Sequence, residues 1–99
     1  MAYEMLVAMN VTDTTRYAQY REAMKPLLAE YGGGFRYDFE VSETFSEAPA
    51  HDVTRVFAIY FSDEAASGSF FADPRYLEVK REHYEGAVDG HTVIAAYDR

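Results

Sequence analysis

The run Thr54–Phe61 constrains the fold of this chain more than any other stretch. It is the most continuously apolar, β-branched and aromatic segment of the sequence, and Ser62-Asp63-Glu64 follows it as a helix-start signal. A run of this length and composition is typical of a strand that is buried on both faces. The sequence therefore predicts a sheet in which residues 54–61 form a central strand.

The rest of the chain supplies three more strands and two helical layers. Apolar periodicity, capping residues (Thr12 or Asp13 for the first helix, Asp73 for the last) and the glycines at 32–34 and 86 mark their ends. We expect strands at residues 3–10, 35–41 and 92–97, and helical segments at residues 12–31, 62–71 and 75–84. This β-α-β-β-α-β order predicts a single α+β domain over residues 1–99 with a ferredoxin-like fold. Its four-stranded antiparallel sheet would have the order 4-1-3-2, with the helices on one face.

Composition excludes several classes of protein. The chain is 48% hydrophobic and 16% aromatic, which is incompatible with intrinsic disorder. No apolar run approaches the roughly 20 residues of a membrane span, and the N-terminus carries no secretory signal. A net charge of −8 and the lack of a basic stripe argue against nucleic-acid binding. Without cysteine, neither disulfides nor thiolate chemistry is available. We expect a cytoplasmic protein.

Apolar residues on both faces of the strands predict a partner. Helices can cover only one face of the sheet, so the second face would expose a patch larger than monomers usually tolerate. A second copy, packed sheet against sheet, is the simplest cover and also protects the edge strands. We therefore expect a homodimer.

The segment 35–41 leaves one question open. Its alternation places Phe35, Tyr37 and Phe39 on one face and the charged residues on the other. The long loop at 42–52 does not fix the register, so Arg55 could share a face with Asp38 or with Phe39. Pairing with Asp38, Glu40 or Glu43 is the structural interpretation of Arg55, and recognition of a ligand carboxylate is the functional one.

Four segments carry a resemblance to a known family. They are Tyr17-Ala18-Gln19-Tyr20, Tyr31-Gly32-Gly33, Arg55-Val56-Phe57 and Phe71-Ala72-Asp73-Pro74-Arg75-Tyr76-Leu77. Together they resemble the domain-of-unknown-function 1330 family, in the dimeric α+β barrel superfamily. The resemblance covers nearly the whole chain and implies the same fold and dimer. Residues 37–41 differ from the family, where an Arg-Gly-Gly-like stretch is frequent. The family has no settled activity, so no catalytic residue is implied.

Relatives in that superfamily, among them cofactor-independent monooxygenases, muconolactone isomerase-like enzymes and haem-binding dismutases, imply a cavity between helices and sheet. In this chain, Tyr17 and Tyr20 would reach it from the first helix. His83 shares a helical face with Tyr76 and Val79, which predicts that its imidazole points inward. The further candidate substrate-binding residues are Tyr37 and Arg55, from the sheet. A partly buried histidine that only satisfies its own hydrogen bonds is the structural alternative for His83.

Two functions follow from these candidates. In the first, the protein is an enzyme that acts on a small aromatic or unsaturated acid without a cofactor, with His83 moving protons and Tyr17 or Arg55 holding the substrate. In the second, it is a non-catalytic ligand-binding or interaction module. Haem binding, with His83 as axial ligand, is a weaker third. Neither His51 nor His91 has a second histidine at metal-ligand spacing, so we expect no metal site.

Overall fold

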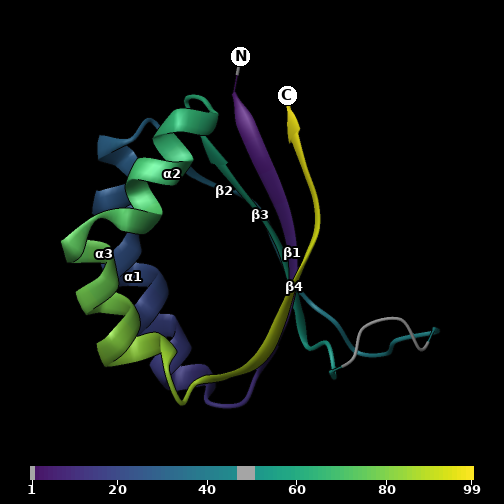
Figure 1. Ribbon diagram of the computed structural model, residues 1–99. Coiled ribbons are helices and arrows are strands. Elements are labelled where there is room, and N and C mark those ends of the chain that lie inside the picture. The colour runs from purple at the N-terminus through teal and green to yellow at the C-terminus, as the bar shows by residue number, and fades with distance from the viewer. Residues whose placement is uncertain (1, 47–50) are drawn as a thin grey trace.

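The computed structural model describes residues 2–46 and 51–99 and contains one antiparallel sheet of four strands in the order β2-β3-β1-β4. All helices lie on one face of this sheet (Figure 1). The strands are β1 (Tyr3–Val11), β2 (Gly34–Glu40), β3 (Arg55–Phe61) and β4 (Val88–Asp98). The helices are α1 (Thr14–Glu30), α2 (Glu64–Ala72) and α3 (Pro74–Val79), and α3 continues into the π-helical turn η1 (Lys80–Tyr84). The predicted ferredoxin-like topology and strand order are confirmed.

A side-chain cap marks the start of helix α1, and glycines mark its end. The Asp13 carboxylate accepts the backbone N–H of Arg16 at 3.0 Å and caps the first turn. At the other end the N–H of Gly33 reaches the Leu28 carbonyl at 2.8 Å, and Gly32 takes a left-handed φ of 67°. This Schellman arrangement satisfies the last carbonyls of the helix. The chain then turns tightly into β2, next to the C-terminal end of β3.

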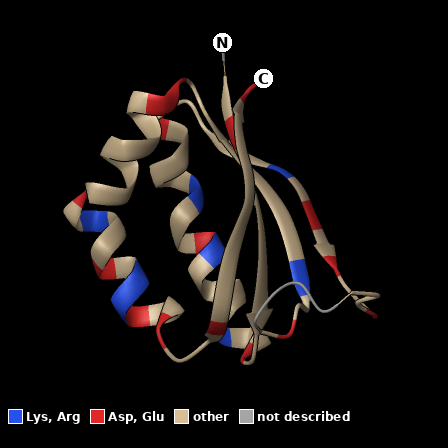
Figure 2. Ribbon diagram, turned by 45° about the vertical axis from the view of Figure 1, so that its right-hand side comes forward, with Lys and Arg blue, Asp and Glu red and all other residues tan. Residues whose placement is uncertain are grey.

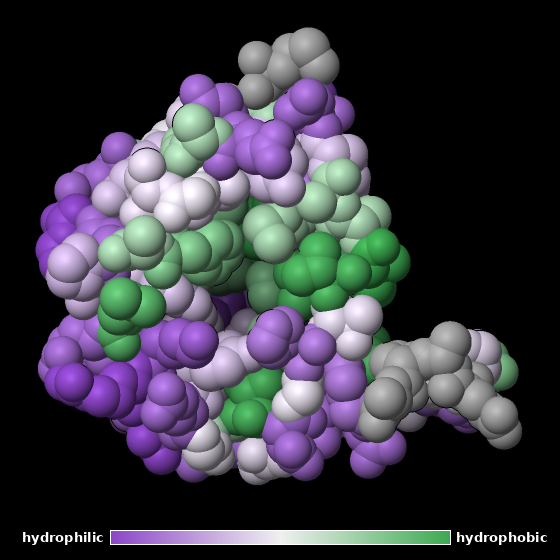
Figure 3. All heavy atoms as spheres, viewed as in Figure 1, coloured by the Kyte–Doolittle hydropathy of each residue, from purple (hydrophilic) through white to green (hydrophobic). Residues whose placement is uncertain are grey.

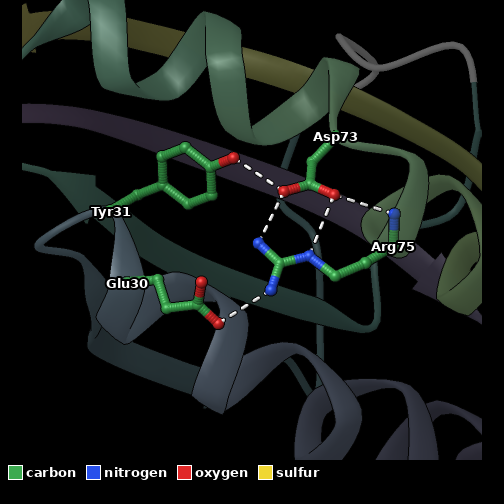
Figure 4. Close-up of polar contacts among 4 residues, drawn as sticks. All are labelled: Glu30, Tyr31, Asp73 and Arg75. Carbon is green, nitrogen blue, oxygen red and sulfur yellow. Dashed lines mark hydrogen bonds and ion pairs between the residues drawn. The ribbon is translucent and has the colours of Figure 1, made fainter.

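A polar cluster ties the C-terminus of α1 to the junction of α2 and α3 (Figure 4). The Asp73 carboxylate caps α3 through the N–H of Arg75 at 2.8 Å and accepts the Tyr31 hydroxyl at 2.7 Å. Arg75 also bonds Asp73 through its guanidinium and reaches the Glu30 carboxylate at 3.0 Å. The hydrogen bonds from Arg75, followed by that from Tyr31, hold the pKa of Asp73 well below its usual range. The cluster thus fixes α3 against α1.

The face of the sheet that the helices cover holds the hydrophobic core. Alternation along β1 directs Met5, Val7 and Met9 to this face, and the register of β3 places Phe57 and Ile59 beside them. Helix α1 contributes Tyr17, Tyr20, Met24, Leu27 and Leu28 to the same core. Most charged residues lie along the helices and toward the ends and edges of the sheet (Figure 2).

The opposite face of the sheet combines a buried charge with exposed aromatic side chains. Glu4 is fully buried there, and its carboxylate accepts Arg36 Nε and Nη2 at 2.5 and 2.6 Å as well as the Tyr97 hydroxyl. The hydrogen bonds from Arg36 are the main reason that the pKa of Glu4 falls to about 2. Tyr37 and Phe39 remain 47% and 58% exposed on the same face. We call this surface the outer face.

β-bulges in both edge strands change the expected alternation. The pairing of β2 with β3 shifts by one residue at Arg36, so Phe35 lies on the helix-covered face while Tyr37 and Phe39 lie on the outer face. The expectation that these three aromatic residues share a face is therefore wrong. A second shift between Val93 and Ala95, at Ile94, places Val93 on the helix-covered face and Ala95 and Tyr97 on the outer face. Both bulges redirect side chains at the rim of the sheet.

Candidate functional site

A cavity of about 310 Å³ lies between the helices and the sheet. It opens between the helical layer and β4, where the space-filling view shows a hollow (Figure 3). Ligand sites commonly start at this volume. Every strand and every helix contributes to its wall. The lining residues are Met5, Val7, Met9, Tyr17, Tyr20, Met24, Phe35, Phe57, Ile59, Phe71, Tyr76, Leu77, Lys80, Tyr84, His91 and Val93.

The inner part of the cavity is apolar except for buried tyrosines. Tyr17, Tyr20 and Tyr76 are 1%, 5% and 6% exposed. The hydroxyls of Tyr20 and Tyr76 form a hydrogen bond of 2.9 Å across the space between α1 and α3. Burial raises the pKa of Tyr17, of Tyr20 and of Tyr76 above the ordinary range. All three are neutral phenols at physiological pH.

The mouth of the cavity carries the basic groups. Lys80 and Tyr84 come from η1, and His91 comes from the N-terminal half of β4. The Tyr84 hydroxyl lies 3.2 Å from His91 Nδ1, and the Lys80 amine lies 5.9 Å from the centre of the Tyr84 ring. Burial raises the pKa of Tyr84 to about 12, so this phenol stays protonated, and its hydroxyl either donates to Nδ1 or accepts Nδ1–H, depending on the imidazole tautomer. In the second tautomer Nε2 keeps a free lone pair at the cavity rim.

The cavity lining is not acidic, although the chain as a whole is. Within the described part of the chain, no aspartate or glutamate lines the cavity, although the protein has a net charge of −8. The titratable lining groups are four phenols, one amine and one imidazole. Such a lining suits a ligand with hydrogen-bond acceptors or a negative charge. Among residues 2–46 and 51–99, no group of three or more His, Cys, Asp or Glu side chains could hold a metal ion.

The prediction that His83 points into the cavity is wrong, because the last helical turn is not an α-turn. In η1 the N–H of Glu85 bonds the carbonyl of Lys80 at 3.1 Å, which is the i→i+5 pattern of a π-helix. Each residue of such a turn advances by a smaller angle than in an α-helix. The inward positions therefore become Tyr76, Lys80 and Tyr84. His83 lies beside Glu82 instead, with a separation of 3.7 Å.

Arg55 and Tyr37 do not line the cavity either. The β2 bulge brings Asp38 to the face of Arg55, and Arg55 Nε bonds the Asp38 carboxylate at 2.7 Å. Arg21 of α1 contacts the same carboxylate at 2.8 Å, so two guanidinium groups share one anion. Arg55 also lies over the Tyr17 ring, 4.8 Å from its centre. This arrangement is the structural interpretation of Arg55. Tyr17 and Tyr20, by contrast, do line the cavity.

Four polar lining residues, Tyr76, Lys80, Tyr84 and His91, are not among the site residues that the sequence predicts. For Tyr76 the sequence predicts only an inward helical face. The sequence places His91 just before the last strand, which it predicts to start at Thr92. In the structure β4 starts earlier, at Val88, and the pairing of His91 with Met9 puts its side chain on the cavity side. Alternation counted back from Val93 would have indicated this position.

The sheet order and the helical layer define a ferredoxin-like α+β protein. A sequence profile of a domain of unknown function, DUF1330, matches residues 2–97. The chain belongs to this family. No curated protein matches it.

Solved structures share the fold at low sequence identity. A protein of unknown function from Rhodopseudomonas palustris is 19% identical with a TM-score of 0.80, over 97% of this chain and 80% of that one. A dimeric ferredoxin-like protein of unknown function from Bacteroides fragilis is 11% identical with a TM-score of 0.64, covering 99% and 96%. The hydroxynitrile lyase of Passiflora edulis is 17% identical with a TM-score of 0.66, covering 97% and 91%. At such identities the likeness concerns the fold alone. In the described residues, no helix is long and apolar enough to cross a membrane.

Proposed function

We propose that the protein binds a small aromatic or unsaturated acid in the cavity between its helices and its sheet. This proposal depends on the composition of the cavity lining. The lining is largely apolar, and its amine and imidazole, from Lys80 and His91, lie at the mouth. An apolar body would fill the interior, and a carboxylate at the mouth would meet the amine and the imidazole.

We further propose that the site is enzymatic and works without a cofactor. His91 takes the role proposed for His83 from the sequence: in the tautomer that donates Nδ1–H to the Tyr84 oxygen at 3.2 Å, its free Nε2 accepts a proton from the bound acid, and the phenol orients the ring. In an isomerase-like reaction the same imidazole returns the proton at another carbon, so no other reactant is consumed. A monooxygenase-like reaction would consume molecular oxygen. The fold is compatible with enzymatic activity, since one structural relative is named a hydroxynitrile lyase.

The alternative is a non-catalytic binding module. It is favoured by the charged side chains outside the cavity, because Arg55 and Arg21 both pair with the Asp38 carboxylate and neither lines the cavity. In this case the ligand would be bound and released unchanged.

Thermal unfolding in the presence of small aromatic acids, lactones and quinols tests the proposal. A ligand present at about 100 times its Kd stabilises the folded state by roughly 2.7 kcal/mol and raises Tm by several degrees. Hits are then assayed for turnover in the wild type, in His91→Ala and in His83→Ala, the matched control outside the cavity. Turnover lost only in His91→Ala supports the enzyme. Binding without turnover supports the module, and a panel without any hit contradicts a site for such acids.

We also propose that the protein is a homodimer that buries its outer faces. The exposed aromatic residues of that face, Tyr37, Phe39 and Tyr97, favour a partner, and a relative of the same fold is described as dimeric. Sedimentation equilibrium at micromolar concentration should give twice the chain mass of 11.3 kDa. A stable species at the mass of one chain would contradict the dimer.

A further inference from the structure

An unused hydrogen-bond donor lies in the interior of the cavity. Tyr20 and Tyr76 carry two hydroxyl hydrogens, and the 2.9 Å bond between their oxygens uses one of them. In the part of the chain that the structure describes, neither oxygen has another partner. Both side chains are more than nine-tenths buried and line the cavity, so the second hydrogen lacks an acceptor among the described residues, and a ligand in the cavity can supply one.

Tyr17 adds a second donor of the same kind. Its side chain is 1% exposed and lines the cavity next to Tyr20, with the two ring centres 5.8 Å apart. No hydrogen bond to its hydroxyl is formed by any described residue. A hydroxyl that lines the cavity without a partner in the protein is available to a ligand that supplies an oxygen.

The acceptor at this depth is an uncharged oxygen. The surroundings are Met24, Phe57, Ile59 and other apolar side chains, which stabilise no negative charge. The same burial raises the pKa of the Tyr20 phenol, which means that an anion is disfavoured there. A carbonyl oxygen fits this environment, whereas a second carboxylate does not.

The mouth differs from the interior in both charge and exposure. Lys80 and His91 lie there beside Leu77 and Val93, which are 48% and 45% exposed. A carboxylate bound between these residues keeps part of its hydration and gains the charge of the lysine. The two ends of the cavity therefore select different oxygen groups.

We propose that the cavity recognises a two-ended ligand, a carboxylic acid whose apolar body carries a carbonyl group at the end remote from the carboxylate. The carboxylate lies at Lys80 and His91, and the carbonyl accepts the free hydrogen of the Tyr20–Tyr76 pair. A cavity of about 310 Å³ has the volume of roughly ten water molecules, which matches one aromatic ring with two small substituents. This inference rests on the proposed acid-binding function and specifies its ligand class.

Three probes of nearly equal size separate the two ends. They are 4-acetylbenzoate, which has both groups, 4-isopropylbenzoate, which lacks the carbonyl, and 4′-methylacetophenone, which lacks the carboxylate. Calorimetric titration should show that 4-acetylbenzoate binds about tenfold more tightly than 4-isopropylbenzoate, the contribution of one hydrogen bond to a buried donor. It should also bind about tenfold more tightly than 4′-methylacetophenone.

Variants assign each end to its residues. In Tyr20→Phe alone, the Tyr76 hydroxyl can still donate, so the double variant Tyr20→Phe/Tyr76→Phe is needed. It should lower the affinity for 4-acetylbenzoate most of the way to that of 4-isopropylbenzoate, since only the Tyr17 hydroxyl remains as a donor in the interior, and leave the latter unchanged. Lys80→Met should weaken both benzoates equally and leave 4′-methylacetophenone unchanged. Tyr31→Phe, which removes a phenol outside the cavity, should change none of the three affinities.

The outcomes distinguish this inference from the proposed function. If both benzoates bind wild type equally well, or if the double variant weakens both equally, the interior carbonyl site is wrong and the acid site remains. If neither benzoate binds, the acid site is wrong and the two-ended ligand with it.

Discussion

The two faces of the sheet handle polar groups in opposite ways. On the outer face the buried carboxylate of Glu4 is surrounded by Arg36 and Tyr97, and its hydrogen bonds are satisfied within the chain. On the helix-covered face, phenols line a cavity in which at least one buried hydroxyl hydrogen has no acceptor among the described residues. Both faces are made from the same four strands, and side chains alternate between them.

This difference indicates what each face can bind. A surface whose charges are already paired and whose aromatic groups are exposed offers shape and apolar area, which suits a second protein surface. A cavity with unsatisfied donors offers hydrogen bonds to a small molecule. This difference supports the proposals that the helix-covered face recognises a ligand and that the outer face associates with a second copy.

The largest effect is expected when one new carboxylate is placed on each surface. Each of these two variants should lose only one property, dimerisation or ligand binding. Phe39→Glu puts a charge on the outer face, where burial in a dimer would leave it unpaired, so the dimer Kd should rise about 100-fold or more. Leu77→Glu puts the charge at the cavity mouth, where it should repel aromatic acids and leave the dimer intact. Sedimentation and ligand titration of both variants measure this. If either variant lost both dimerisation and ligand binding, the two faces would not have separate functions.

A smaller effect, on stability, is expected where Arg21 and Arg55 contact Asp38 on the helix-covered face. Arg55→Met removes hydrogen bonds to Asp38 and the contact with the Tyr17 ring. Arg21 still neutralises Asp38, so the free energy of unfolding should fall by about 1–3 kcal/mol, less than the 3–5 kcal/mol of a fully broken buried pair. Urea denaturation checks the value. Little or no loss would mean that Arg55 is retained for a ligand rather than for stability.

The buried carboxylate of the outer face predicts a pH dependence. The pKa of Glu4 is about 2 in the folded protein and about 4.3 in an unfolded chain, so the folded state binds fewer protons between these values. Its contribution to stability is complete above about pH 5 and is lost as the pH falls toward 2. Glu4→Gln should flatten this part of the profile, most visibly as lower stability at neutral pH. Chemical denaturation at several pH values tests this, and an unchanged slope would contradict the assignment.

The smallest effect is expected at the cluster that holds α3 against α1. Tyr31→Phe removes one hydrogen bond to Asp73, while the bonds from Arg75 remain. We expect a lower Tm than in wild type but a smaller decrease than for Arg55→Met. Differential scanning calorimetry provides the measurement. A decrease as large as that of Arg55→Met would show that Tyr31 has a greater structural role than its single bond indicates.

Local signals in the sequence were sufficient for the fold. The apolar run at residues 54–61 identified a central strand, Asp13 and Asp73 marked helix starts, and the glycines after Tyr31 marked a helix end. Each of these features depends on neighbouring residues, so no long-range information was needed. Strand order then followed from connection rules alone.

The cavity lining could be predicted only in part, because it depends on one-residue shifts. The bulge at Arg36 moved Asp38 to the face of Arg55 and Tyr37 away from it, and the π-turn exchanged His83 for Tyr84. A bulge or a π-turn leaves the apolar pattern of the surrounding residues almost unchanged, so periodicity does not reveal it. Tyr17 and Tyr20 were placed correctly since α1 is a regular α-helix.

The π-turn also has an evolutionary consequence. It is the form that an α-helix takes when it absorbs one inserted residue without disturbing the rest of the domain. A single-residue deletion between Lys80 and Tyr84 would restore α-helical spacing and still keep the Tyr84 phenol on the cavity side. Conversion of the turn to α-helical spacing without a deletion would instead bring His83 inward, so the spacing of this one turn decides whether a phenol or an imidazole is presented on the same scaffold.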